Sequence, residues 1–269
     1  MDYIYAAIVG LIHGLCGILP VSEVGHLQIL KKFTDLGGAE AAVGPILPLA
    51  VLAAVVLVFH KTVWQMLLGL GTMIGGAFNG RFKWRKASKY QLMAVYLLIA
   101  AVPMGIVAFI RQFFSLTENL LLIGAMLLVT AGIIFIGTHS LCRGWTMLDM
   151  KPGHALKLGL FQAAAVFLPG LSRSGVTYSM GMNMGFDRET AMEFSFMLSI
   201  PALLTSFLMN LGGFSAMVPL SALVAAGVAL LAGVGACLLL RALIRKDRFG
   251  IFLFYTAALG IAALVINFI

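Results

Sequence analysis

Long apolar stretches alternate with short polar ones along almost the entire chain. A transmembrane helix needs about 20 mostly apolar residues. Six stretches meet this requirement and are predicted to span a membrane: 41–59, 92–110, 119–137, 191–212, 218–240 and 249–269. The pattern predicts an all-α integral membrane protein, and we assign residues 1–269 to a single membrane domain.

Two further segments, 3–30 and 158–186, begin apolar, break at a Leu-Pro pair and continue as polar sequence. Thirteen of the 18 lysines and arginines lie in three loops, at 60–91, 138–157 and 241–248. The positive-inside rule places these three loops in the cytoplasm. Counting spans between them, each broken segment must enter and leave on the same side. We therefore expect two re-entrant helical hairpins, the first entering from outside and the second from the cytoplasm.

The two hairpins resemble each other in sequence. The first reads GLIHGLCGILPVSEVG from Gly10, and the second reads GLFQAAAVFLPGLSRSG from Gly159, an offset of 149 residues. Each hairpin is followed by three predicted spans, which gives a first repeat at about 3–137 and a second at about 158–269. An odd number of crossings per repeat predicts two inverted halves, the architecture of many transporters whose ligand site lies where broken helices meet.

Composition and charge exclude several classes of protein. The chain is 61% hydrophobic and 10% charged, whereas a soluble domain carries about 25% charged residues. The net charge of +8 is explained by cytoplasmic loops that face anionic lipid, and no separate basic domain indicates a nucleic-acid partner. The three cysteines are far apart and predict neither a metal site nor a disulfide framework.

The second hairpin carries the sequence FLPGLSRSGVT, which combines a permanent charge with a broken helix. An arginine at membrane depth indicates a functional site, and the Arg173 guanidinium matches the oxygens of phosphate or carboxylate. Ser172, Ser174 and Thr177 add hydroxyl donors, and Gly175 exposes backbone N–H groups. We expect a phosphate to bind here; the alternative is that the arginine only holds backbone carbonyls.

The first hairpin carries LPVSEVGH, which contains Ser22, Glu23 and His26. A serine or histidine beside a carboxylate can attack phosphorus or transfer protons. Placed opposite Arg173, these residues predict phosphoryl chemistry. The alternatives are that Glu23 only neutralises the arginine and that His26 is a structural histidine. His13, half-way along the first arm, is a further candidate base or a structural residue.

At these motifs the sequence resembles the undecaprenyl-diphosphatase family, also called the bacitracin-resistance family. LPVSEVGH, PGLSRSGVT and AMEFSFMLSIP resemble its motifs, and the resemblance covers the whole chain in order. The resemblance implies hydrolysis of a C55 polyprenyl diphosphate to the monophosphate at the outer face of the bacterial inner membrane, which recycles the cell-wall lipid carrier. It also implies a divalent cation, Mg or Ca, and a homodimer. Arg173 and the hydroxyls around it would hold the diphosphate, with Ser22 and His26 at the reacting phosphorus.

The chain departs from the family pattern at three positions. The family's two glutamates before Leu-Pro correspond to His13 and Gly17, and the second serine of its Ser-Ser pair is Glu23. The identities of the nucleophile and of any metal ligands are therefore open. Our first hypothesis is a phosphatase in which Glu23 and His13 take over the acid and base roles. The second is a non-hydrolytic polyprenyl-phosphate carrier or flippase that keeps the phosphate site, and the third is a sensor or partner subunit.

Overall fold

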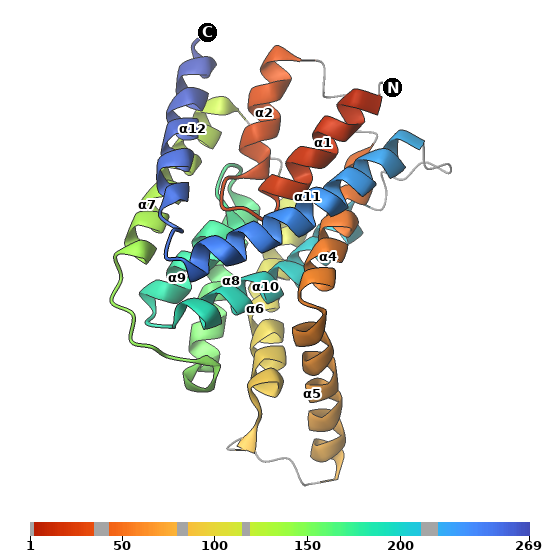
Figure 1. The fold of residues 1–269 in the computed structure, drawn as a ribbon, viewed down its shortest axis with the longest axis vertical. Coiled ribbons are helices and arrows are strands. Elements are labelled where there is room, and N and C mark those ends of the chain that lie inside the picture. Colours follow the sequence, from red (N-terminus) through yellow and green to blue (C-terminus); the bar gives the residue numbers. More distant parts are fainter. Residues whose placement is uncertain (1–2, 35–42, 80–85, 115–118, 211–219) are drawn as a thin grey trace.

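The computed structural model describes residues 3–34, 43–79, 86–114, 119–210 and 220–269. The secondary structure in these ranges consists of helices, without strands, which confirms the all-α fold class. The described α-helices are α1 (Tyr3–Cys16), α2 (Glu23–Phe33), α4 (Leu47–Val58), α5 (His60–Phe78), α6 (Lys89–Arg111), α7 (Leu120–Thr138), α8 (Pro152–Phe167), α9 (Arg173–Asn183), α10 (Arg188–Met209), α11 (Leu220–Arg245) and α12 (Ile251–Asn267). Figure 1 shows them as one bundle from which α5 projects.

Four of the described helices, α6, α7, α10 and α11, are long and apolar enough to cross a membrane. They lie at the predicted spans 92–110, 119–137, 191–212 and 218–240. The last predicted span forms α12, which is shorter at 17 residues. Parts of three predicted spans, at residues 41, 42, 211, 212, 218 and 219, lie outside the described residues.

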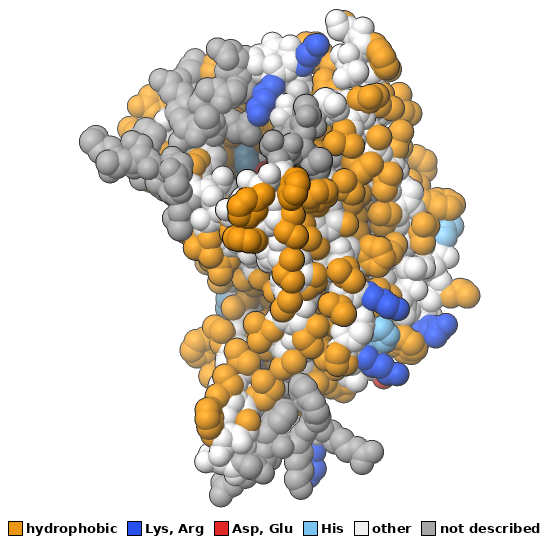
Figure 2. Space-filling view, turned by 180° about the vertical axis from the view of Figure 1, so that it is seen from behind, with side chains coloured by type: hydrophobic (Ala, Val, Ile, Leu, Met, Phe, Trp, Pro, Cys, Tyr) orange, Lys and Arg blue, Asp and Glu red, His pale blue; other side chains and the backbone are white. Residues whose placement is uncertain are grey.

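The exterior of the bundle is apolar, as lipid contact requires. Figure 2 shows hydrophobic side chains spread widely over the part of this face that is drawn by type, where Lys and Arg appear in a few small groups. Leu204, Leu231 and Phe254 are among the large apolar side chains exposed on the membrane-capable helices and α12. A soluble monomer rarely exposes apolar patches larger than a few hundred Å².

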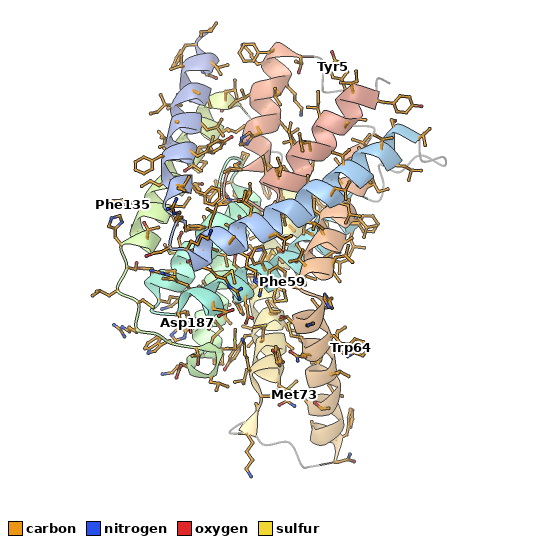
Figure 3. The ribbon with its side chains drawn as sticks, in the orientation of Figure 1. Tyr5, Phe59, Trp64, Met73, Phe135 and Asp187 are labelled. Atoms are coloured by element: carbon orange, nitrogen blue, oxygen red, sulfur yellow. The ribbon has the colours of Figure 1, made fainter. Side chains whose placement is uncertain are left out.

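The region 60–91 was predicted to be a cytoplasmic loop; its first part is a helix instead, and its side of the membrane stays a prediction. Residues 60–78 form α5, which meets α4 at an angle of 87°. The loop prediction rested on basic residues, but five of the six lie beyond the end of α5, at 81–89. The sequence between Lys61 and Arg81 has no charged residue, and most of it belongs to this helix. None of its residues is buried, and Trp64, labelled in Figure 3, is exposed.

Both predicted hairpins break where expected. The chain leaves α1 at Cys16 and α8 at Phe167, and each Leu-Pro pair lies in the turn that follows. Proline has no N–H to continue a helix and clashes with the preceding turn. The second helix of each hairpin then starts with a serine cap: Ser22 accepts from the N–H of Gly25 and Ser172 from that of Gly175, both at 3.3 Å.

Equivalent helices of the two predicted repeats make equivalent contacts. Helix α1 packs along α11, and α8 packs along α6. A Cβ added to Gly10 would lie 2.3 Å from the carbonyl oxygen of Ala225, and one added to Gly159 would lie 2.3 Å from that of Ala100. Only glycine permits this approach. In each case the first helix of one predicted repeat packs on a helix of the other, as an internal repeat would require. The inversion of the two halves across the membrane stays a prediction.

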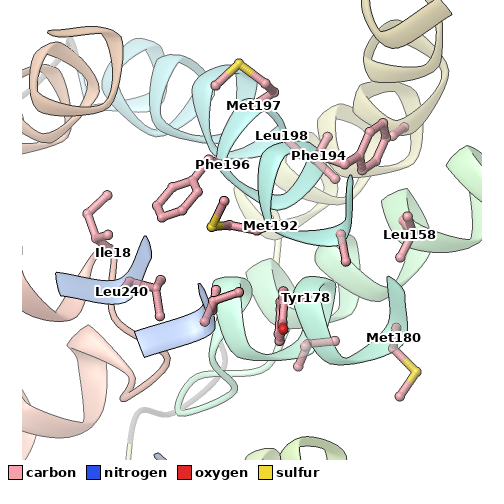
Figure 4. Packing of buried hydrophobic residues seen from close by; sticks show 14 of the residues in the cluster. Ile18, Leu158, Tyr178, Met180, Met192, Phe194, Phe196, Met197, Leu198 and Leu240 are labelled. Atoms are coloured by element: carbon pink, nitrogen blue, oxygen red, sulfur yellow. The ribbon is translucent and has the colours of Figure 1, made fainter. Parts of the chain in front are cut away.

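Helix α10 lies at the centre of the core and supports both hairpins. Figure 4 shows its buried Phe194 and Phe196 in one cluster with Tyr178 of α9, Leu240 of α11 and Ile18 from the turn of the first hairpin. Close packing of this kind fixes helix positions, because interiors are as dense as organic crystals. The two hairpin turns are therefore held at defined positions relative to each other.

Candidate active site

A cavity of about 390 Å³ lies where the two hairpin turns meet α6 and α10. Its floor is formed by the turns and by the first residues of α2 and α9. Its walls are largely apolar, with Met104 and Ala108 from α6, Val166 from α8 and Ala202 from α10. The sequence analysis expected a ligand site between the hairpins, and the structure places this cavity there.

Glu23 and Arg173 face each other on the floor of the cavity. Arg173 Nη2 lies 3.7 Å from Glu23 Oε2, and His13 Nδ1 lies 2.8 Å from Glu23 Oε1. The arginine comes from the second hairpin, and the other two residues come from the first. The expected juxtaposition of Glu23 and Arg173 across the hairpins is therefore present in the structure.

His13 stands behind Glu23 rather than in the cavity lining. Its side chain is about nine-tenths buried, and its Nε2 has no hydrogen-bond partner within the described part of the chain. An imidazole that donates from Nδ1 keeps Nε2 as an acceptor. This geometry orients Glu23, much as one side chain orients the next in a catalytic triad.

Three adjacent residues of the second hairpin, Ser172, Arg173 and Ser174, line the cavity. The Ser172 Oγ accepts the cap bond from Gly175, so its hydroxyl proton remains able to donate elsewhere. The Ser172 N–H donates to the Thr130 hydroxyl on α7 at 3.1 Å, which fixes the turn. Helix α9 begins at Arg173, and the positive end of its dipole lies beside the cavity. These features suit an anion.

Two predicted phosphate-binding residues lie behind the lining. The buried Thr177 hydroxyl is 2.9 Å from Gln162 Oε1 and 2.8 Å from the carbonyl oxygen of Arg173, so it ties α9 to α8. A Cβ on Gly175 would lie 3.0 Å from Pro20, so this glycine lets the two turns approach. Direct phosphate contacts by Thr177 and Gly175 stay predictions.

The first hairpin places only part of its predicted set at the cavity. Ser22 and Glu23 line it, but His26 does not. The His26 Nδ1 lies 2.8 Å from the carbonyl oxygen of Ser22, and its Nε2 lies 2.7 Å from the hydroxyl of Tyr255 on α12. Both ring nitrogens are thus engaged away from the cavity. This placement does not support a role for His26 at the reacting phosphorus, and that role stays a prediction.

The sequence analysis missed the polar residues at the far end of the cavity. Arg111 and Gln112 at the end of α6, and Ser206 and Asn210 at the end of α10, line the cavity there. The Arg111 Nη1 donates to the carbonyl oxygen of Val166 at 2.7 Å. Nothing in the local sequence marks Arg111, because a charge at the end of an apolar stretch is typical of any membrane helix.

Comparison with known proteins assigns the chain to a family. The sequence pattern of the family described as bacitracin resistance protein BacA matches residues 6–262. The chain belongs to the BacA family. It is 34% identical to an undecaprenyl-diphosphatase of Methanobrevibacter smithii, over 97% of this chain and 96% of that protein. It is 33% identical to one of Bacteroides fragilis over 99% of both chains, and 32% identical to one of Desulfosudis oleivorans over 97% of both.

Membership of the BacA family, together with the membrane-capable helices, makes this a multi-pass membrane protein. The family resemblance also implies Mg or Ca, and either ion needs a particular set of donors. Hard cations take six or more oxygen ligands, usually with carboxylates among them. Glu23 is the sole carboxylate among the described cavity-lining residues, and no group of three His, Cys, Asp or Glu side chains gathers anywhere in the described ranges. The residues present do not fit such an ion.

Proposed function

We propose that the protein is a polyprenyl diphosphate phosphatase that converts a C55 polyprenyl diphosphate to the monophosphate. The observation that carries this proposal is the cavity in which Glu23, held by His13, faces Arg173 from the opposite hairpin. The undecaprenyl-diphosphatase names of the BacA-family relatives support the substrate class.

The floor of the cavity supplies groups that would hold a diphosphate. The Arg173 guanidinium offers a rigid fork of donors to two oxygens at once. The hydroxyls of Ser172 and Ser174 and the N-terminus of α9 add donors on the same side. The apolar walls above, which include Met104 and Val166, suit the first isoprene units of the lipid.

Glu23 is the group placed to accept a proton. A water that attacks the terminal phosphorus forms a new P–O bond and gives its proton to the Glu23 carboxylate. The bond from that phosphorus to the bridging oxygen breaks, and the bridging oxygen leaves as part of the lipid monophosphate. Charge develops on these oxygens beside Arg173, where a fixed cation stabilises the transition state. Ser22 is the other candidate nucleophile, and its hydroxyl would give its proton to the same carboxylate.

The position of the cavity supports the proposed location. Its far end lies at the last residues of α6 and α10, whereas the basic residue Lys89 begins α6 and Arg245 pairs with Glu189 at the start of α10. With the basic loops in the cytoplasm, the cavity opens toward the outer face of the bacterial inner membrane. Hydrolysis there would return the lipid carrier to cell-wall synthesis. We also propose that the protein forms the homodimer that the family resemblance implies.

The test is phosphate release by the purified protein from two lipids that differ by one phosphate. We expect release from C55 polyprenyl diphosphate and none from C55 polyprenyl monophosphate under the same conditions. Binding of the diphosphate without phosphate release, in any buffer with or without magnesium or calcium, would contradict the proposal and would match a carrier instead.

A further inference from the structure

The charges that line the cavity bear on whether the reaction needs a divalent cation. Among the described lining residues there are two arginines, Arg111 and Arg173, and one carboxylate, Glu23. The described lining is thus already net positive. A divalent cation bound here would add two further positive charges to a site that holds a single negative one.

Both oxygens of that carboxylate are already engaged. Glu23 Oε1 lies 2.8 Å from His13 Nδ1, and Oε2 lies 3.7 Å from Arg173 Nη2. A cation at Oε2 would be repelled by the guanidinium, and one at Oε1 would share that oxygen with the imidazole. The adjoining Gly17 contributes no side chain, and a Cβ added there would lie 3.2 Å from Oε2. The first arm therefore provides no second carboxylate at this point.

The groups present supply what a cation would contribute to phosphoryl transfer. A metal ion neutralises charge on the phosphoryl oxygens and lowers the pKa of an attacking water. Arg173 and the N-terminus of α9 provide fixed positive charge for the oxygens. Glu23, oriented by His13, provides the base that takes the proton from water.

We infer that this protein hydrolyses its diphosphate substrate without a divalent cation, an inference that rests on the proposed function. In this mechanism Arg173 takes the place of the metal, and the His13–Glu23 pair provides the base. Water adds to the terminal phosphorus, its proton passes to Glu23, and the bridging oxygen leaves with the electrons of the broken P–O bond. Phosphorus keeps its oxidation state, and no further reactant is needed.

The first experiment compares turnover with and without cations. Purified protein is treated with EDTA, and phosphate release from C55 polyprenyl diphosphate is measured in EDTA and in millimolar magnesium or calcium. We expect rates that agree within about threefold. A loss of tenfold or more in EDTA that magnesium or calcium restores overturns the inference and leaves the proposed function intact. Absence of release in every buffer overturns the proposed function and this inference with it.

The second experiment measures cation binding directly, without turnover. Manganese is titrated into the purified wild-type protein and into Glu23→Gln, and bound ion is counted by electron paramagnetic resonance. Glu189→Gln is the matched control, because Glu189 is an exposed carboxylate paired with Arg245. We expect the same binding curve for all three proteins. A saturable site that disappears only in Glu23→Gln shows that the carboxylate holds a metal, and the inference is wrong.

Discussion

Replacing Arg173 by lysine tests the proposed phosphate contact most sharply. Lysine keeps the positive charge but loses the planar fork that engages two phosphate oxygens together. The Arg173 side chain is 26% exposed, so water replaces a lost contact only in part. A hydrogen bond to a charged group contributes about 1.5–3 kcal/mol, and about 1.4 kcal/mol corresponds to a tenfold change in rate. Loss of one bond therefore predicts a fall in kcat/KM of roughly 10- to 150-fold.

The assay is the rate of phosphate release from C55 polyprenyl diphosphate by purified protein at limiting substrate. Arg188→Lys is the matched control, because Arg188 pairs with Asp247 at 2.6 Å, and both side chains are largely exposed. We expect the control to retain nearly full activity and both variants to elute as the wild type does on size exclusion. If Arg173→Lys retains activity within twofold of the wild type, Arg173 is a structural residue and the phosphate contact is wrong.

Three further predictions concern the cation, pH and topology. His13→Glu places a second carboxylate against Glu23, so manganese should bind this variant saturably; no gain in binding would contradict the inference that a missing carboxylate keeps cations from the wild-type site. A hydrogen bond from the Thr146 N–H holds the pKa of Asp149 below its usual range. The ionised carboxylate therefore stabilises the fold at any pH above its unfolded pKa, and this stabilisation is lost as the pH falls through the lower pKa of the folded state. Asp149→Asn should therefore lower Tm slightly at pH 7 and not at pH 2; an equal change at both would refute this. With the native cysteines removed, Asn119→Cys should react with an impermeant thiol reagent from outside and Ser88→Cys should not; the reverse pattern would end the topology argument.

The hairpins and the core of the site could be predicted from sequence because their signals are local. A Leu-Pro pair followed by polar sequence favours a helix break, and a serine is a preferred N-cap for the helix that follows. The contact of Glu23 with Arg173 needed one further step, the internal similarity of the two hairpins. That similarity placed both turns at the same depth.

Other features depend on distant contacts and could not be predicted in this way. Arg111 reaches the cavity because α6 packs beside the end of α8, and nothing in its own surroundings indicates this. His26 pairs with Tyr255, which lies 229 residues away in the sequence. Helix α5 was missed for a different reason, since the basic residues beyond its end dominated the interpretation of the whole region. Basic residues indicate which side of the membrane a segment faces, but they do not mark where a helix ends.

The central claim is that Glu23 performs acid–base chemistry on a bound diphosphate, and Glu23→Gln tests it most directly. Glutamine keeps the size and hydrogen-bonding capacity of the side chain but cannot accept the proton. Loss of a general base lowers a rate by about 10²- to 10⁴-fold. The measurement is single-turnover phosphate release from C55 polyprenyl diphosphate by the wild type, Glu23→Gln and the control Glu189→Gln, together with lipid binding. We expect the rate of phosphate release to fall by about 10²-fold or more only in Glu23→Gln, with lipid binding retained. A Glu23→Gln rate equal to that of an active wild type would contradict the role of Glu23 as the base.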